Sequence, residues 1–161
     1  MSKNPQSVPR RFPEWLVRPW SGGAAQEEVR ELLEGLHLHT VCQSARCPNL
    51  GECWSRRTAT FMILGNVCTR HCRFCAVKSG APLPVDASEP ERVAEAVHRL
   101  GLAHAVVTMV TRDDLPDGGA EQVARTIRAI RKWSPKTTVE VLTSDFNGNP
   151  ELIKTVMDAS P

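Results

Sequence analysis

The six cysteines of this 161-residue chain are the residues best suited to chemistry, and they fall into two groups of three. The upstream trio has the spacing C-x4-C-x5-C and the downstream trio has C-x3-C-x2-C; their members are Cys42, Cys47 and Cys53 upstream, and Cys68, Cys72 and Cys75 downstream. Three closely spaced thiolates suit a cubane iron–sulfur cluster, because thiolate ligation is the rule for such clusters. Neither trio supplies a fourth thiolate, so one iron of each cluster is left open to another ligand.

Zinc, a redox pair and disulfides are the alternatives for these cysteines. Structural zinc sites take four ligands, usually in paired C-x2-4-C knuckles, whereas only Cys72 and Cys75 form a C-x2-C pair here. His71 could complete a Cys3His set, but its position next to Cys72 makes joint ligation awkward. A single redox pair would leave four cysteines unexplained. Three disulfides require an oxidising compartment, and we find no secretory signal. The favoured interpretation is an iron–sulfur protein.

The composition indicates a soluble globular protein of about one domain. Hydrophobic residues make up 41% and charged residues 24% of the chain, which are ordinary proportions. The net charge of +2 gives no reason to expect nucleic acid or a membrane as the main partner. No apolar run approaches the roughly 20 residues of a membrane span. We therefore expect a cytoplasmic protein.

The hydrophobic pattern predicts alternating strands and helices that position the downstream trio. Strands are expected at 59–65, 104–108 and 137–142, and helices at 24–36, 88–100, 120–133 and from 149 onward. Three successive βα units imply parallel strands joined by right-handed crossovers. Ligands of such sheets gather outside the carboxyl ends of the strands. The downstream trio follows the first strand at that place, and the loops 111–119 and 143–148 should rim the same mouth.

Local signals complete this framework. Ser88 and Glu91 have the spacing of a capping box at a helix start, and Gly101 is placed to end that helix. The upstream trio surrounds the turn-forming residues 48–51, which predicts a loop that folds around a cluster. Residues 1–20, rich in proline and tryptophan, are expected to form an extended arm.

A C-x3-C-x2-C group directly after a buried strand resembles the radical S-adenosylmethionine (SAM) superfamily. The resemblance implies that the downstream thiolates hold three irons of a [4Fe–4S] cluster, while the amino and carboxylate groups of SAM chelate the fourth. One electron then cleaves SAM into methionine and a 5′-deoxyadenosyl radical, which abstracts hydrogen from an unactivated C–H bond. The implied fold is α/β: the first three βα units of a partial radical SAM barrel at 59–161, preceded by a helical and loop-rich cluster-binding extension at 1–58.

Longer stretches are similar to the lipoyl synthase family: CQSARCPNLGECW at 42–54, ATFMILGNVC at 59–68 and VTRDDLPDGG at 110–119. The resemblance implies sulfur insertion at carbons 6 and 8 of an octanoyl chain carried on a lysine of a lipoyl carrier domain. An auxiliary [4Fe–4S] cluster on the upstream trio would be the sulfur source. The implied partners are octanoylated carriers, namely the E2 subunit of 2-oxoacid dehydrogenases and the glycine cleavage H protein, and a ferredoxin- or flavodoxin-type reductant.

The chain also departs from the family pattern. The Arg-Ser-Ser motif, whose serine ligates the auxiliary cluster in the family, does not occur, and Met109 stands where a small polar residue is expected. The family continues through three more βα units beyond the third helix, at which this sequence ends. We expect a fragment, or a protein completed by a second polypeptide, without full activity on its own. The alternatives are another two-cluster radical SAM enzyme, or a cluster- or zinc-binding module without catalysis.

The resemblance further suggests residues that contact SAM. Asp113, Asp114 and Asp117 lie with Gly118 and Gly119 where the superfamily binds the SAM amino group. Carboxylates can accept its N–H bonds, and glycines let the backbone approach closely. A polar turn before a helix N-terminus, where acidic residues are favoured, explains the same pattern equally well.

Other side chains are candidates for contact with SAM or with the clusters. Arg112 is expected to pair with the SAM carboxylate or with Asp114, and Phe74 to cover the cluster and the adenine or to pack in the core. Thr108, at a strand end, is a weaker candidate. Arginines near the trios would balance anionic clusters or form a solvated face: Arg46, Arg56, Arg57, Arg70 and Arg73.

Overall fold

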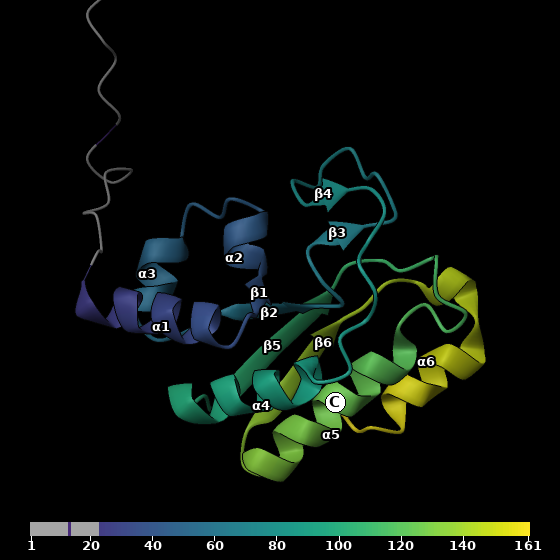
Figure 1. Cartoon of the computed structure of the whole chain (residues 1–161). Coiled ribbons are helices and arrows are strands. Elements are labelled where there is room, and N and C mark those ends of the chain that lie inside the picture. Colours follow the sequence, from purple (N-terminus) through teal and green to yellow (C-terminus); the bar gives the residue numbers. More distant parts are fainter. Residues whose placement is uncertain (1–12, 14–22) are drawn as a thin grey trace, which may run out of the picture.

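The computed structural model describes Pro13 and residues 23–161, so the rest of the predicted arm lies outside the described residues. A four-stranded sheet with the order β1-β2-β5-β6 forms its centre (Figure 1). The strands are β1 (His39–Thr40), β2 (Thr60–Ile63), β5 (His104–Met109) and β6 (Thr138–Leu142). β2, β5 and β6 run parallel, and β1 pairs with β2 antiparallel. The predicted parallel strands are confirmed, whereas their membership of a partial barrel stays a prediction.

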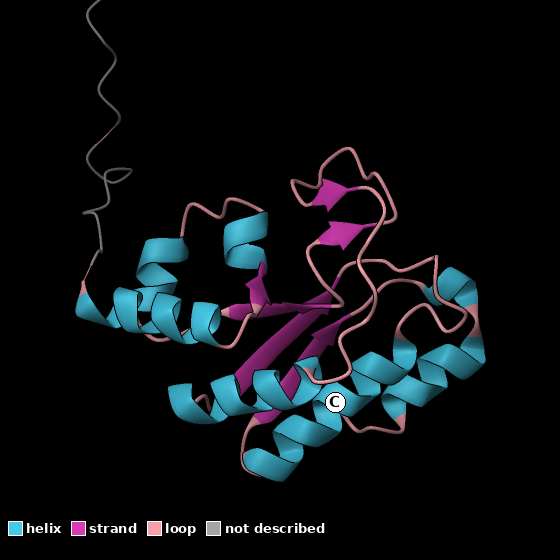
Figure 2. Ribbon diagram, viewed as in Figure 1, coloured by secondary structure: helices cyan, strands magenta, loops and turns pink. Residues whose placement is uncertain are grey.

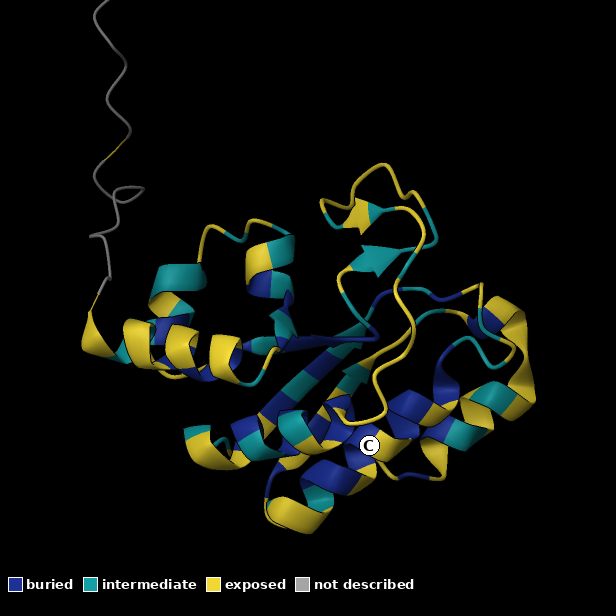
Figure 3. Cartoon of the chain, viewed as in Figure 1, coloured by how far each residue is buried: buried dark blue, intermediate teal, exposed yellow. Residues whose placement is uncertain are grey.

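One helix follows each parallel strand, and the three helices cover one face of the sheet (Figure 2). They are α4 (Glu89–Leu100), α5 (Ala120–Trp133) and α6 (Pro150–Met157). Along β5, Ala105 and Val107 are buried whereas His104 is exposed, because successive strand residues point to opposite faces. The main core therefore lies between this face of the sheet and the buried sides of α4 and α5 (Figure 3).

Helix α4 begins in a different way from the predicted capping box. The Ser88 hydroxyl donates to Asp86 Oδ1 at 2.6 Å and makes no cap bond to the helix. Arg92 also donates to the Asp86 carboxylate, at 2.8 Å. The prediction was wrong because Asp86 offers Ser88 a charged acceptor two residues away, and Glu91 plays no part in the cap. Gly101, with φ +65°, ends the helix as predicted, since this left-handed conformation favours glycine.

The segment that carries the upstream trio is partly helical, which corrects the prediction of a loop. It contains α2 (Val41–Ser44) and α3 (Leu50–Ser55), and α1 (Ala24–Gly35) precedes it. The Thr40 side chain accepts a hydrogen bond from the Gln43 backbone N–H at 3.3 Å and so caps α2. Trp54 of α3 is 2% exposed and belongs to the same core as Val29 and Leu33 of α1. A cap and an aromatic anchor therefore stabilise these short helices.

Two short strands that the sequence did not predict flank the downstream trio. β3 (Val67–Cys68) and β4 (Lys78–Ser79) pair in parallel and form a separate two-stranded sheet. Residues 69–77 connect them and carry Cys72 and Cys75; we call this segment the cysteine loop. It stands on the side of the sheet to which the carboxyl ends of β2, β5 and β6 point (Figure 1).

Candidate functional site

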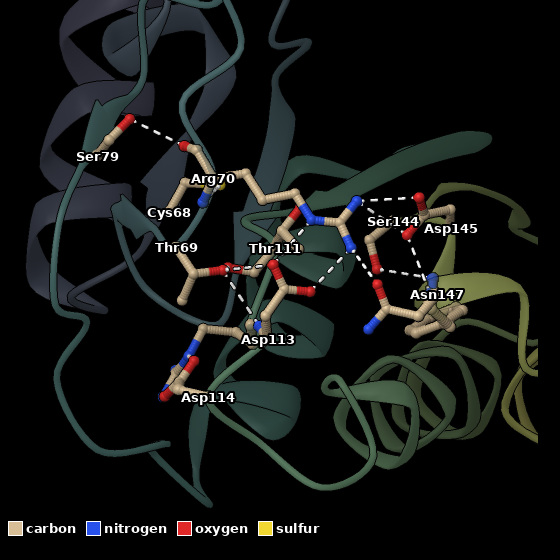
Figure 4. Close-up of polar contacts among 12 residues, drawn as sticks. Cys68, Thr69, Arg70, Ser79, Thr111, Asp113, Asp114, Ser144, Asp145 and Asn147 are labelled. Carbon is tan, nitrogen blue, oxygen red and sulfur yellow. Dashed lines mark hydrogen bonds and ion pairs between the residues drawn. The ribbon is translucent and has the colours of Figure 1, made fainter.

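The cysteine loop is tied to the segment that follows β5 (Figure 4). The Thr69 backbone N–H and hydroxyl both donate to the Thr111 carbonyl at 3.0 Å. In return, the Asp113 backbone N–H donates to the Thr69 hydroxyl at 3.1 Å. At the other end of the loop, the Gly80 N–H donates to the Cys68 carbonyl at 2.9 Å. The downstream trio thus begins at the carboxyl ends of the parallel strands.

Arg70 extends these ties to the loop after β6. Its guanidinium makes two hydrogen bonds of 2.8 Å to the Asp113 carboxylate, one of 2.9 Å to Asp145 and one of 2.8 Å to the Asn147 side-chain oxygen. These bonds from Arg70 hold the pKa of both Asp113 and Asp145 below the usual aspartate value. The cysteine loop and the loops that follow β5 and β6 therefore meet at one cation.

The three downstream thiols differ in exposure. Cys68 is half-buried, and its Sγ accepts a hydrogen bond from the Arg70 backbone N–H at 3.4 Å. Cys72 and Cys75 are exposed, in a turn closed by the Cys75 N–H donating to the Cys72 carbonyl at 3.0 Å. Phe74 between them is 94% exposed. Phe74 therefore does not pack in the core formed by the residues that the structure describes.

The upstream thiols lie within electrostatic range of one another. Cys42 is buried in α2, and the Cys47 N–H donates to its carbonyl at 3.0 Å. The pKa of the Cys53 thiol is raised, first by burial and then by the nearby Cys42 and Cys47. The helices α2 and α3 and the turn between them thus bring three thiols into one neighbourhood.

The donor set of each trio fits an iron–sulfur cluster in type and number. All six thiols are free, and three thiolates leave one iron without a protein thiolate. Among the residues described, no group of three or more His, Cys, Asp or Glu side chains stands close enough to hold a metal ion. The thiols of a trio must therefore approach one another to share a cluster. His71, the candidate fourth ligand for zinc, instead has its Nδ1 3.2 Å from the Ser79 hydroxyl.

Arg112 pairs with Asp114, which was one of the two partners predicted for it. The arginine is 2% exposed, and its Nε and Nη2 donate to the two Asp114 carboxylate oxygens at 2.8 Å each. Its Nη1 donates to the Leu64 carbonyl at 3.2 Å. The bond from Arg112 also lowers the pKa of Asp114. The N–H groups of Arg112 therefore bond to acceptors within the protein, while Asp114 remains partly exposed.

The two glycines have a packing role that the sequence did not indicate. Gly118 and Gly119 have φ of +57° and +88°, which favours glycine. A Cβ on Gly119 would lie 2.4 Å from Leu64 Cδ1, and one on Gly118 would lie 3.2 Å from the Phe146 ring. Asp117 accepts from the Gly119 and Glu121 N–H groups at the start of α5. These contacts match the predicted alternative of a polar turn before a helix.

Glu89 is a site residue that the sequence analysis missed. It is 5% exposed, and its carboxylate accepts from the Leu64 N–H at 2.9 Å and from Gln122 Nε2 at 3.3 Å. Leu64, at the end of β2, has φ +68°. Arg112 thus donates to the Leu64 carbonyl, and Glu89 accepts from the Leu64 N–H. These two contacts fix the backbone of Leu64 where the chain turns toward the downstream trio. The one sequence signal for Glu89 is its place in the first turn of a helix, where acidic residues are common.

The remaining candidates are placed as follows. The Thr108 hydroxyl donates to the Leu142 carbonyl at 3.0 Å, which ties the ends of β5 and β6. Arg56 pairs with Glu52, and Arg57 pairs with Glu28, both on the surface. Of the five arginines predicted near the trios, Arg70 alone bonds to several distant side chains among the described residues.

The chain is similar to known proteins of one superfamily. The family model of the Radical SAM superfamily matches residues 62–161. The lipoyl synthase of Rubrobacter xylanophilus is 60% identical over 149 residues, that of Symbiobacterium thermophilum 59% over 151, and that of Chloroflexus aggregans 54% over 162. These matches cover 92, 94 and 98% of this chain, but 46, 47 and 53% of the relatives. The chain spans about half the length of the curated relatives it matches.

Proposed function

Because the chain belongs to the radical SAM superfamily, we propose that it is part of a lipoyl synthase. We further propose that the downstream trio holds the SAM-binding [4Fe–4S] cluster. The proposed reaction is the insertion of two sulfur atoms at carbons 6 and 8 of a protein-bound octanoyl chain. The observation that carries the proposal is the place of the trio, on a loop tied to the ends of parallel strands. The 54–60% identity to lipoyl synthases supports the same assignment.

Residues of the cysteine loop and its neighbours divide the work in this proposal. The bound cluster would supply the electron that cleaves SAM. Cys68, Cys72 and Cys75 would hold three of its irons, and the Arg70 N–H already points at Cys68 Sγ. Asp114, fixed by Arg112, would accept from the SAM amino group. Gly118 and Gly119 would let the backbone approach SAM, with Thr108 at the rim, and the exposed ring of Phe74 would cover the adenine.

The upstream trio is proposed to hold an auxiliary [4Fe–4S] cluster that gives up sulfur. A cluster consumed in this way needs a weak fourth ligand rather than a fourth thiolate, and this trio supplies three thiols. Cys42 and Cys47 lie near enough to Cys53 to raise the pKa of its thiol, which supports a shared site. We propose residues 1–58 as the extension that carries this cluster, and residues 59–161 as the first half of a partial barrel.

The partners proposed are those of the family. They are octanoylated E2 and H-protein carrier domains as substrates, and a ferredoxin- or flavodoxin-type reductant. A cytoplasmic location is proposed with them. In the part of the chain that the structure describes, no helix has the length and apolar character to span a membrane.

Anaerobic reconstitution tests the proposal. We expect about eight irons with matching sulfide per chain, from two [4Fe–4S] clusters, and release of 5′-deoxyadenosine on addition of SAM and dithionite. Cys72→Ala with Cys75→Ala should lose about half of the iron and all of the 5′-deoxyadenosine. Cys47→Ala with Cys53→Ala should lose about half of the iron and keep the 5′-deoxyadenosine. A colourless chain with stoichiometric zinc would contradict the proposal.

An octanoylated carrier peptide then tests the substrate. A thiolated octanoyl product supports lipoyl synthase. Formation of 5′-deoxyadenosine without any thiolated product would favour another two-cluster radical SAM enzyme over lipoyl synthase.

A further inference from the structure

Arg70 lies between two of the proposed cluster ligands in the sequence, and its side chain extends away from Cys68 toward the loops after β5 and β6 (Figure 4). Its backbone N–H donates to Cys68 Sγ, while the guanidinium reaches Asp113, Asp145 and Asn147. We propose that Arg70 is a positioning residue, whose guanidinium fixes the cysteine loop against the loops after β5 and β6 before a cluster binds. This inference rests on the proposed function only where it concerns SAM.

The geometry needs an arginine rather than a generic cation. Two parallel hydrogen bonds of 2.8 Å join Nε and Nη2 to the two Asp113 oxygens. Nη1 and Nη2 still reach Asp145 at 2.9 Å and Asn147 at 2.8 Å. A planar guanidinium offers five donors in a fixed fork, whereas a lysine ammonium is a point charge on a flexible stem. Lysine at this position would keep the charge but could not hold both loops in this geometry.

The Asn147 end of the network is itself a constrained turn. Phe146 and Asn147 have φ of +45° and +53°, conformations that are uncommon for residues other than glycine. Asp145 Oδ1 accepts from the Asn147 N–H at 3.0 Å, and the buried Phe146 ring faces Gly118. Such conformations persist only where the surroundings over-determine them. Arg70 is one of those surroundings, so its contacts link the order of the β6 loop to that of the cysteine loop.

The sequence suggested another role for Arg70, as a cation that balances an anionic cluster. Two carboxylates already face its guanidinium, so the group as a whole carries a net negative charge. Arg70 is therefore poorly placed to neutralise a cluster through its side chain. Its contribution has to pass through the backbone that it holds, and that backbone carries Cys68 two residues earlier.

Hydrogen exchange in the cluster-free chain tests the proposal without relying on the loaded protein. In Arg70→Gln, the backbone amides of the cysteine loop should exchange at least about tenfold faster than in the wild type, because charge-assisted hydrogen bonds are lost. Arg70→Lys should rescue only a small part of this protection. Asp145→Asn, which leaves the cysteine loop unaltered, should show a smaller increase in the same amides. Arg128→Gln, which breaks the exposed pair with Glu121 on α5, is the matched control and should leave loop exchange unchanged.

In reconstituted protein, titration of SAM against the EPR signal of the reduced cluster adds a second readout. We expect the half-saturating SAM concentration to rise by about tenfold in Arg70→Gln at unchanged iron content. Weaker SAM binding with unchanged loop exchange would overturn the proposal, because Arg70 would then act on SAM directly. Equal effects in Arg128→Gln would also overturn it. If Arg70→Gln does not fold, Asp145→Asn decides by the same two measurements. A wild-type chain that binds no cluster refutes the proposed function, while the exchange data still judge Arg70.

Discussion

The upstream trio lies on and between two short helices whose hydrogen bonds join residues close in sequence, whereas the downstream trio depends on contacts with distant segments. Upstream, the Cys47 N–H donates to the Cys42 carbonyl, and the Thr58 N–H to the Cys53 carbonyl. Downstream, the contacts of Thr69 and Arg70 reach 42 to 77 residues along the chain. The upstream site is thus a local construction, and the downstream site requires the whole parallel sheet.

This difference matches the roles that we propose. A site that binds SAM has to present an open iron at a fixed place above the strands, so it benefits from ties to all three strand ends. A cluster that gives up its sulfur needs only a compact set of donors. Damage to the loops after β5 and β6 should therefore affect the downstream site and spare the upstream one.

The largest effect that we predict comes from Gly119→Ala. Its Cβ would lie 2.4 Å from Leu64 Cδ1, at a backbone φ of +88°, so steric overlap adds to backbone strain. We expect the free energy of unfolding to fall by about 3 kcal/mol, measured by urea denaturation. Gly148→Ala is the control, because its φ of +72° is strained but nothing lies within 4 Å of the new Cβ. It should cost about 1 kcal/mol. Equal losses in the two variants would show that Leu64 does not require Gly119.

A smaller loss is predicted for Arg112→Met, which removes the grip on the Leu64 carbonyl and the partner of Asp114. We expect about 2 kcal/mol, less than for a fully buried ion pair because Asp114 is partly exposed. Arg128→Met, at an exposed ion pair, should cost less than about 0.5 kcal/mol. Urea denaturation at neutral pH measures the loss of unfolding free energy in both variants. Similar losses would show that the contacts of Arg112 with Leu64 and Asp114 contribute little to stability.

The contribution of Arg112 to the free energy of unfolding should depend on pH. Arg112 holds the pKa of Asp114 below the usual 3.8, so the charged aspartate is favoured in the folded protein. The stabilisation is fully present above about pH 4 and is lost as the pH falls through the lowered pKa. The difference in unfolding free energy between wild type and Arg112→Met should therefore be flat from pH 6 to 4 and should shrink below it. A difference that shrank already between pH 6 and 5 would point to another titrating group.

The smallest effect concerns thiol reactivity in the reduced, cluster-free chain. Cys72 and Cys75 are exposed whereas Cys42 is buried, so alkylation of Cys42 must wait for local opening. Iodoacetamide, followed by mass spectrometry, should modify Cys72 and Cys75 at least about tenfold faster than Cys42. The difference should disappear in concentrated urea. Equal rates in the folded chain would show that α2 does not protect Cys42.

The order of strands and helices was predictable because its signals are local. Alternating apolar runs, the terminal Gly101 and the strand before the downstream trio are all visible within short windows of sequence. The pairing of Arg112 with Asp114, two residues apart, was accessible for the same reason. By contrast, the capping box at Ser88 looked sound locally and was wrong, since Asp86 offers a stronger acceptor.

What the sequence did not provide are pairings between distant residues. The partners of Arg70, the role of Glu89 on Leu64 and the fit of Leu64 over Gly119 link positions 25 to 77 residues apart. No periodicity marks such contacts. The helices α2 and α3 were missed because they are short and lack a repeating pattern; the Thr40 cap stabilises α2 and the burial of Trp54 stabilises α3.

The most direct test of the account is the EPR response to SAM in two double variants, each reconstituted anaerobically and reduced. We predict that Cys47→Ala with Cys53→Ala keeps a SAM-dependent change in the cluster spectrum, because the downstream trio is intact. Cys72→Ala with Cys75→Ala should lose this change while it retains the signal of the upstream cluster. A SAM-dependent change that survives in the second variant would contradict the assignment of SAM to the downstream trio.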